Sequence, residues 1–208
     1  MRIIVAFIIF IVCPINTFAS DSDSLSYRVF NIGNTADIEN TEAYSLALKK
    51  LISSKKTPAL LIINGDLIKK SKSIYLGTDS LKIFKMLSII STIDNAQIIV
   101  IPGDRDWNNS KKNGLKKVEK IENLVEHSDF KNVKWILDNG CPGPEIIELD
   151  STLLLMTINT QWWNHPHEKP TSVDGKCDII TKKDFIIEFE NALAETENKN
   201  LIIAGHFP

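Results

Sequence analysis

The sequence lacks an excess of charge of either sign, a long apolar run and any internal repeat. Its 208 residues carry 24 lysines and arginines against 26 aspartates and glutamates, a formal net charge of −2 with a pI near 6.1. A chain this close to neutrality gives no sign of a nucleic-acid surface. Hydrophobic content of 43% and charged content of 24% are ordinary for a folded domain. With no linker or low-complexity stretch to divide it, the chain is long enough for one domain with a core of its own.

The longest apolar run is short. It is "IIVAFIIFIVC", residues 3–13, preceded by a basic residue and followed by "NTFAS". A membrane span needs about 20 such residues, whereas a basic start, a short apolar segment and small residues before a cut are typical of a signal peptide. We predict a signal peptide at 1–19, cleaved after Ala19, and an exported domain at 20–208, in the periplasm, at the cell surface or secreted. A lipid anchor at Cys13 is the alternative, disfavoured by the bulky residue before it and the proline after it.

Cysteine is scarce, with three residues in the chain. Cys13 lies in the predicted signal peptide, so Cys141 and Cys177 remain in the mature domain. A lone pair in an oxidising compartment is a disulfide candidate. In the chain-entropy model, a loop of this length would stabilise the fold by roughly 4 kcal/mol. The alternative is two separate buried thiols; we predict the bridge.

Strand-like and helix-like segments alternate along the first half of the chain. Short runs of apolar and β-branched residues predict strands, and apolar stripes at helical spacing predict helices. The predicted strands are 27–33, 59–65, 97–101, 134–137, 145–149, 152–159 and 200–208, and the predicted helices are 40–54, 79–93, 113–127 and 181–195. Alternation of this kind indicates an α/β fold with a parallel, helix-covered sheet. The short link between 145–149 and 152–159 indicates an antiparallel pair.

Polar side chains follow four of these strands next to a glycine. Asn34 follows the first strand, Asp66 the second, Asp104 the third and His206 the last. Ligands of open α/β sheets bind outside the carboxyl ends of the strands, and glycine lets the chain turn sharply there. Several oxygen and nitrogen ligands at one edge of a sheet predict a metal site. A surface ion pair within "GDRDW" is the alternative for the third turn.

The order of these turns resembles the calcineurin-like metallophosphoesterases, in their exported, purple-acid-phosphatase-like branch. The turns that carry the resemblance are "GNTA", "GD" at 65–66, "GDRDW" at 103–107 and "GHFP" at 205–208, supported by "CPGPEIIEL" and "NTQWWNHPHEKP". The resemblance covers about 27–208. It implies a metallophosphoesterase-like αββα sandwich, two sheets flanked by helices, and a metal-dependent phosphoester hydrolase. The sandwich would be C-terminally incomplete, because the family's last turn, G-H-x-H, is missing.

The resemblance also implies roles for individual residues. The family binds two divalent ions, of Mn, Fe or Zn, that clamp both oxygens of an in-line displacement at phosphorus. Asp66 stands where the family's bridging aspartate stands, and Asp104 and His206 stand at the other ligand positions of one metal. Asn34 takes the position of a ligand to the second metal. Arg105 takes the position of the catalytic histidine that orients the substrate or protonates the leaving group.

Several positions depart from the family pattern. Asn34 is a neutral amide where a carboxylate is expected, and Lys69 stands where that branch has a tyrosine. Arg105 never releases its proton, so it is no general acid, although it can pair with phosphate oxygens. One metal ion at most is well supported. We therefore expect an impaired or inactive phosphoester hydrolase; the alternative is a non-catalytic binding or scaffold module on the same fold.

Aromatic and histidine residues suggest a rim around this site. We place Trp107, His165 and His167 there, on loops beside a phosphoester substrate. Direct metal binding by the two histidines is the alternative. Asp37 could replace the missing carboxylate of the first turn. The sequence leaves the substrate open among sugar phosphates, nucleotides and phospholipid head groups.

Overall fold

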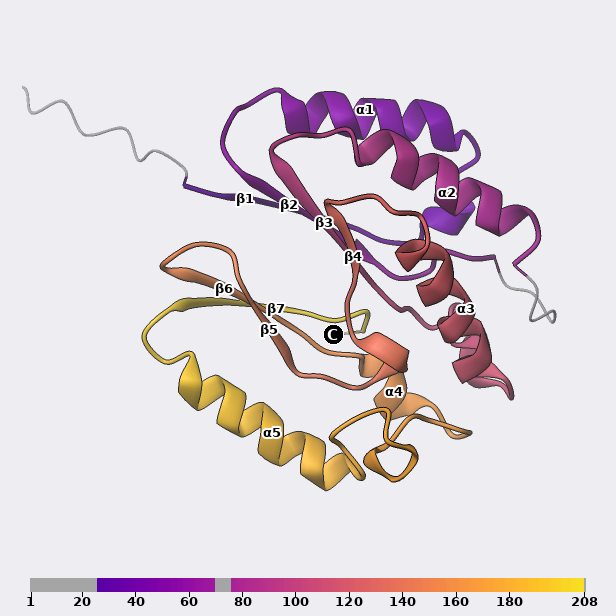
Figure 1. The fold of residues 1–208 in the computed structure, drawn as a ribbon, viewed down its shortest axis with the longest axis vertical. Helices are drawn as coiled ribbons and strands as arrows, with labels where there is room; N and C mark the ends of the chain where they lie inside the picture. The colour runs from indigo at the N-terminus through magenta and orange to yellow at the C-terminus, as the bar shows by residue number, and fades with distance from the viewer. Residues whose placement is uncertain (1–25, 70–75, 208) are drawn as a thin grey trace, which may run out of the picture.

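The computed structural model describes residues 26–69 and 76–207. The predicted signal peptide and Cys13 lie outside these residues. Within them, the strands form two sheets, one of four strands and one of three. Figure 1 shows the two sheets stacked face to face, with helices on both outer sides. The predicted α/β class is confirmed, in a four-layer arrangement of helices, sheet, sheet and helix.

The first sheet is parallel, and its strands follow the order of the chain. It contains β1 (Arg28–Ile32), β2 (Ala59–Asn64), β3 (Ala96–Ile101) and β4 (Val133–Trp135). The connecting helices are α1 (Thr41–Ser53), α2 (Thr78–Ile90) and α3 (Gly114–Glu126). Parallel crossovers are right-handed, so strands in sequential order place all three helices on one face, as Figure 1 shows.

The second sheet combines an antiparallel and a parallel pair. It contains β5 (Glu145–Glu148), β6 (Leu153–Thr157) and β7 (Asn200–Ala204), with β6 in the middle. The predicted antiparallel pairing of β5 with β6 is confirmed, and β7 runs parallel to β6. Between β6 and β7 the chain forms α4 (Thr160–Asn164) and α5 (Lys182–Glu195), and α5 covers the outer face.

Burial explains why β2 and β3 read as continuous apolar runs. One face of these strands packs against the helices, where Leu61, Ile63 and Ile98 join the larger core cluster. The other face, with Leu60 and Ile62, packs against the second sheet in a smaller cluster. A strand covered on both faces needs apolar residues at successive positions.

The disulfide Cys141–Cys177 is confirmed, with Cα atoms 5.7 Å apart. It ties the segment before β5 to the segment before α5. None of the described helices is both long and apolar enough to cross a membrane. A disulfide is in keeping with the predicted export.

Candidate metal centre

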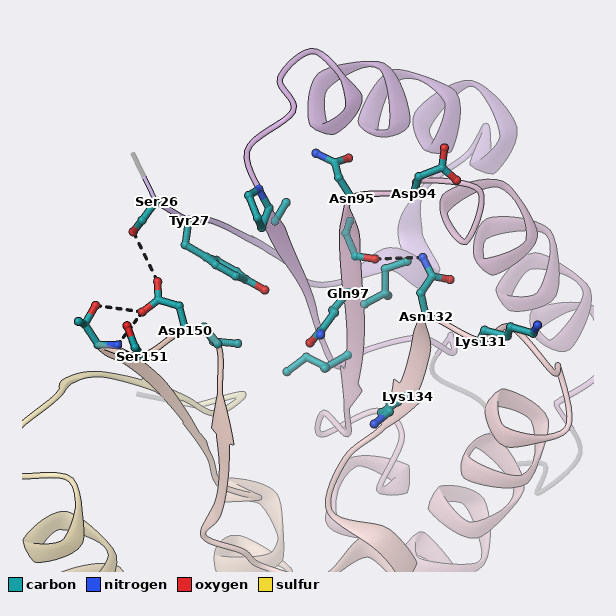
Figure 2. A pocket seen from close by; sticks show the side chains of 17 residues that line it. Ser26, Tyr27, Asp94, Asn95, Gln97, Lys131, Asn132, Lys134, Asp150 and Ser151 are labelled. Carbon is teal, nitrogen blue, oxygen red and sulfur yellow. Dashed lines mark hydrogen bonds between the residues drawn. The ribbon is translucent and has the colours of Figure 1, made fainter. Parts of the chain in front are cut away.

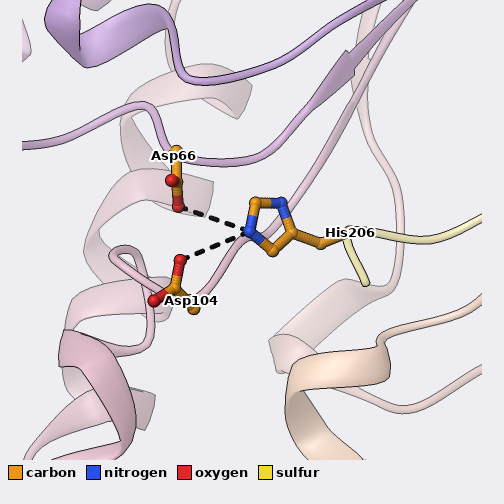
Figure 3. Close-up of side chains that lie close together, drawn as sticks. All are labelled: Asp66, Asp104 and His206. Atoms are coloured by element: carbon orange, nitrogen blue, oxygen red, sulfur yellow. Dashed lines mark hydrogen bonds and ion pairs between the residues drawn. The ribbon is translucent and has the colours of Figure 1, made fainter. Parts of the chain in front are cut away.

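Three side chains from three strand ends meet at one point between the two sheets (Figure 3). Asp66 follows β2, Asp104 follows β3 and His206 follows β7. The Nε2 atom of His206 lies 3.3 Å from Oδ1 of Asp104 and 3.6 Å from Oδ1 of Asp66. One ligand atom from each residue lies within 4.8 Å of the others, so the three residues could hold a metal ion.

The orientation of His206 is set by its other ring nitrogen. Nδ1 lies 2.9 Å from the backbone carbonyl oxygen of Asn64. A carbonyl only accepts, so Nδ1 carries the proton, and in the neutral ring Nε2 presents a lone pair. That lone pair faces two carboxylates, an arrangement that calls for a cation or a proton between them. A backbone carbonyl behind a histidine is the usual way in which a metal-binding imidazole is oriented.

The ends of β2 and β7 are tied together across the two sheets. The side-chain amide of Asn64 donates to the backbone oxygen of Gly205 at 2.9 Å. Together with the bond from His206 to the backbone of Asn64, this gives two hydrogen bonds between neighbouring residues of the two strand ends. The second sheet therefore delivers His206 to the carboxylates of the first.

Two glycines allow the turns after β2 and β3 to approach each other. A Cβ atom on Gly103 would lie 2.5 Å from the backbone nitrogen of Asp66 and 2.8 Å from Cε1 of His206. Gly65 has a φ of 72°, and a Cβ atom there would lie 2.4 Å from Cα of Gly103. Asp66 itself has a φ of 58°, a left-handed conformation that aspartate tolerates better than most residues. The glycines of the two motifs thus make room for the ligands.

Asp106 holds the turn that carries Asp66. Its side chain is fully buried and accepts hydrogen bonds from the backbone nitrogens of Gly103 at 2.8 Å, Asp66 at 2.9 Å and Leu67 at 3.0 Å. Burial raises the pKa of Asp106 to about 7, although these N–H groups favour the ionised form. This role of Asp106 was not predicted from the sequence. The only hint in the sequence was a second aspartate in the same turn. An aspartate in a turn is normally an exposed charge, so its burial could not be predicted.

The charge state of Asp66 reflects its neighbours. Burial raises the pKa of its carboxyl, and the nearby charge of Asp104 acts in the same direction. The backbone N–H of Arg105, 3.1 Å from Oδ1, and the charge of His206 act in the opposite direction. A cation beside these carboxylates would favour their ionised forms.

Arg105 pairs with the other carboxylate oxygen of Asp66 and with Asp37. Its Nε lies 3.3 Å from Oδ2 of Asp66, and its Nη1 lies 2.9 Å from Oδ1 of Asp37. The hydrogen bond from Arg105, with a further one from the side chain of Asn34, lowers the pKa of Asp37. Asn34, predicted as a metal ligand, thus contacts Asp37 on the side of Asp66 where Arg105 lies.

The residues predicted at the substrate rim lie differently. Trp107 is fully buried and His165 is 2% exposed, and their rings are 4.9 Å apart between centroids. A Cβ atom on Gly114 would lie 2.6 Å from Cε1 of His165, so helix α3 begins directly against this ring. His167 lies edge-on to His165, 5.6 Å between centroids, and is exposed. The expectation of a rim is therefore corrected for Trp107 and His165, which are part of the packed interior.

A wide pocket of about 940 Å³ lies at the opposite end of the strands (Figure 2). Several of its polar side chains are engaged in local structure. Asn95 donates to the backbone oxygens of Lys55 and Thr57, and Asp150 accepts from the backbone of Thr152. We therefore assign the candidate site to the carboxyl ends of the strands, where the titratable groups converge, and not to this larger hollow.

Comparison with known proteins found no similarity: no family model, no curated protein and no solved structure matches this chain.

Proposed function

We propose that this chain binds one divalent metal ion at Asp66, Asp104 and His206 and acts on phosphoester bonds, as a metal-dependent phosphoester hydrolase similar to the calcineurin-like metallophosphoesterases. The observation that carries the proposal is the convergence of three ligand atoms: Nε2 of His206 lies 3.3 Å from Oδ1 of Asp104 and 3.6 Å from Oδ1 of Asp66, while Nδ1 faces the backbone oxygen of Asn64. The stacked sheets flanked by helices support the finer assignment of a metallophosphoesterase-like sandwich. The short apolar run at 3–13 and the disulfide support export.

The donor set suits a transition metal ion. Imidazole nitrogen with carboxylate oxygens is typical of Zn²⁺, Mn²⁺ and Fe sites. Ligand atoms about 2.1 Å from an ion at tetrahedral angles lie about 3.4 Å apart. The separations of 3.3 and 3.6 Å between Nε2 of His206 and the two carboxylate oxygens agree with this spacing.

The chemistry follows from the charges around the site. A bound ion supplies Lewis acidity, which polarises a phosphoryl oxygen and lowers the pKa of bound water. Arg105 offers a permanent positive charge beside Asp66, and its side chain is 25% exposed, so it can pair with a second phosphoryl oxygen. Arg105 cannot protonate a leaving group. We therefore expect slow hydrolysis, limited to esters whose alcohol leaves without a proton.

The second candidate function is a non-catalytic module that binds phosphate groups on the same fold. The observation that favours it is the engagement of Arg105 with two carboxylates, in the place where the resemblance puts a catalytic histidine. The hydrolase requires the metal ion, so metal binding is tested first.

Thermal unfolding with Mn²⁺ or Zn²⁺ tests the proposal. We expect either ion to raise the Tm of the wild-type chain, and Asp66→Asn to abolish the rise. Asparagine is chosen because it tolerates the left-handed backbone of this position. Asp94→Asn, an exposed residue in the turn before β3, is the matched control. The absence of any shift in the wild type would end the metal proposal. Hydrolysis of p-nitrophenyl phosphate, which has a good leaving group, then separates the enzyme from the binding module.

A further inference from the structure

The two oxygen atoms of the Asp66 carboxylate face different partners. Its Oδ1 atom points to the imidazole of His206, at 3.6 Å from Nε2. Its Oδ2 atom lies 3.3 Å from Nε of Arg105. A carboxylate that bridges two metal ions has one oxygen for each. Here the second oxygen is already paired with a guanidinium.

The guanidinium is held in this place by a second carboxylate. Nη1 of Arg105 lies 2.9 Å from Oδ1 of Asp37, and the side chain of Asn34 hydrogen-bonds to the same carboxylate. Asn34 and Asp37 follow β1, and the resemblance places a ligand of a second metal ion at the end of this strand. The groups expected to bind that metal are therefore used to anchor Arg105.

The negative charge on this side of Asp66 is already partly neutralised. The negative charges of Asp66 and Asp37 meet the positive charge of Arg105, and the charge of Lys69 also acts on Asp37. A divalent ion placed here would be repelled by the positive charge of Arg105, which lies against both carboxylates. Among the described residues, the group of three that could hold a metal ion at this site includes Asp66 but not Asp37.

The simplest alternative is that Arg105 and Asp66 form an ordinary surface ion pair that does not affect the metal site. Their burial argues against this alternative. The side chains of Arg105 and Asp66 are 25% and 10% exposed, so their charges are poorly screened. Asp66 is also one of the candidate metal ligands, so whatever pairs with Oδ2 acts on the ion at Oδ1.

We propose that Arg105 takes the place of the second metal ion, so that the chain binds a single divalent ion beside a built-in guanidinium. The inference rests on the proposed function, because it concerns the same site. It differs from the two-metal site that the resemblance implies. In this site Arg105 is a positioning residue for an oxyanion and an electrostatic competitor of the metal.

Isothermal titration with MnCl₂ measures both the number of ions and their affinity. We expect the wild-type chain to bind one ion. Arg105→Gln removes the charge and frees Oδ2 of Asp66, so we expect Mn²⁺ to bind about tenfold more tightly or better. Arg105→Lys keeps the charge and should stay close to the wild type. Lys85→Gln removes an exposed charge that pairs with Glu42 on the helical side, and is the matched control.

A double variant tests whether Arg105 occupies a latent second site. Asn34→Asp with Arg105→Gln supplies a carboxylate and removes the guanidinium, and we expect it to bind two ions. Two ions in the wild type, or unchanged affinity in Arg105→Gln, would overturn the inference, as would one ion in the double variant. The Tm of each variant without metal reports whether it folds. If the variants do not fold, the number of ions bound by the wild-type chain is the remaining test, and two ions would overturn the inference.

The titration also separates this inference from the proposed function. One ion in the wild type with unchanged affinity in Arg105→Gln refutes only the role of Arg105. Binding by the variants but not by the wild type supports the role of Arg105 and refutes metal use by the natural chain. No binding in any of the proteins refutes both.

Discussion

The carboxylate of Asp106 lies 2.9 Å from the backbone nitrogen of Asp66, so the turn after β3 holds the turn after β2. The same carboxylate also accepts from Gly103, within its own turn. A buried group with these bonds fixes the backbone of two motifs at once. The position of Asp66 therefore depends on a residue that would not touch the metal.

We expect Asp106→Ala to destabilise the fold by about 3 kcal/mol or more, because several buried N–H groups lose their acceptor. Mn²⁺ binding should be lost with it, since the turn of Asp66 loses its support. Urea unfolding and the Mn²⁺-dependent Tm measure the two effects. Asp94→Ala should change neither. Full Mn²⁺ binding by Asp106→Ala would show that the turn of Asp66 is held by other contacts.

Gly103→Ala should weaken metal binding without a change of charge. The added Cβ atom would lie 2.7 Å from Oδ1 of Asp66 and 2.8 Å from Cε1 of His206, so both ligands must move. Displacement of ligand geometry of this kind costs roughly 10–100-fold in metal affinity.

The control for this glycine is Gly175→Ala, where no other atom lies within 4 Å of the added Cβ. That change costs only the strain of a positive φ, about 1 kcal/mol, and should leave the affinity for Mn²⁺ as it was. Equal Mn²⁺ affinity in Gly103→Ala and the wild type would mean that the two ligands do not meet at this turn.

His165 should make stability depend on pH. Burial, followed by the charges of His167 and Lys169, lowers the pKa of His165 from 6.5 to about 4. Between these values the unfolded chain binds more protons than the folded one, so stability rises with pH across this window and is lost as the pH falls through it. The loss is at most about 3 kcal/mol.

The variant His165→Phe isolates this contribution, because it keeps a ring against Trp107 and does not titrate. Buried carboxyls with raised pKa, Asp106 and Glu122, act in the opposite direction in both proteins, so the difference between wild type and variant is the quantity to measure. Urea unfolding at pH 4.5 and 7 gives that difference. His127→Gln, at an exposed histidine, is the control. Parallel pH profiles for wild type and His165→Phe would contradict the burial of the imidazole.

Loss of the disulfide should lower the Tm. Cys141 and Cys177 are 36 residues apart in sequence, and closing a loop of that size stabilises a protein by roughly 2–4 kcal/mol. For a chain of this length the Tm of Cys141→Ser/Cys177→Ser should fall by roughly 5–15 °C. A reductant should lower the Tm of the wild type by a similar amount and leave the double variant unchanged. Identical Tm values for the oxidised wild type and the double variant would rule out a stabilising bridge.

The local sequence predicted most of the elements. Apolar runs marked β2 and β3 because these strands are covered on both faces, and each predicted helix lies within a few residues of its observed bounds. Helix α5 begins at a capping box that lies within four residues of sequence: the side chain of Thr181 accepts from the backbone nitrogen of Asp184. Hydrogen bonding and burial of this kind depend on neighbours in sequence, so a sequence pattern reveals them.

The partners of Arg105 and the burial of His165 could not be predicted in the same way. Arg105 reaches Asp37 from another strand end, and His165 packs on Trp107 across a long separation in sequence. Such contacts depend on rotamers and on how loops cross. An exposed rim and a packed interior have the same local sequence pattern.

By itself the sequence determined that glycine turns with Asp66, Asp104 and His206 would end three strands, because strand periodicity and glycine are local signals. Only the tertiary structure decided that the second sheet brings His206 against the two carboxylates of the first. The tertiary structure also decided that Arg105 pairs with Oδ2 of Asp66 and with Asp37. The physical reason is that the direction of a side chain at a strand end follows from the packing of one sheet on another, which no neighbouring residue in the sequence specifies.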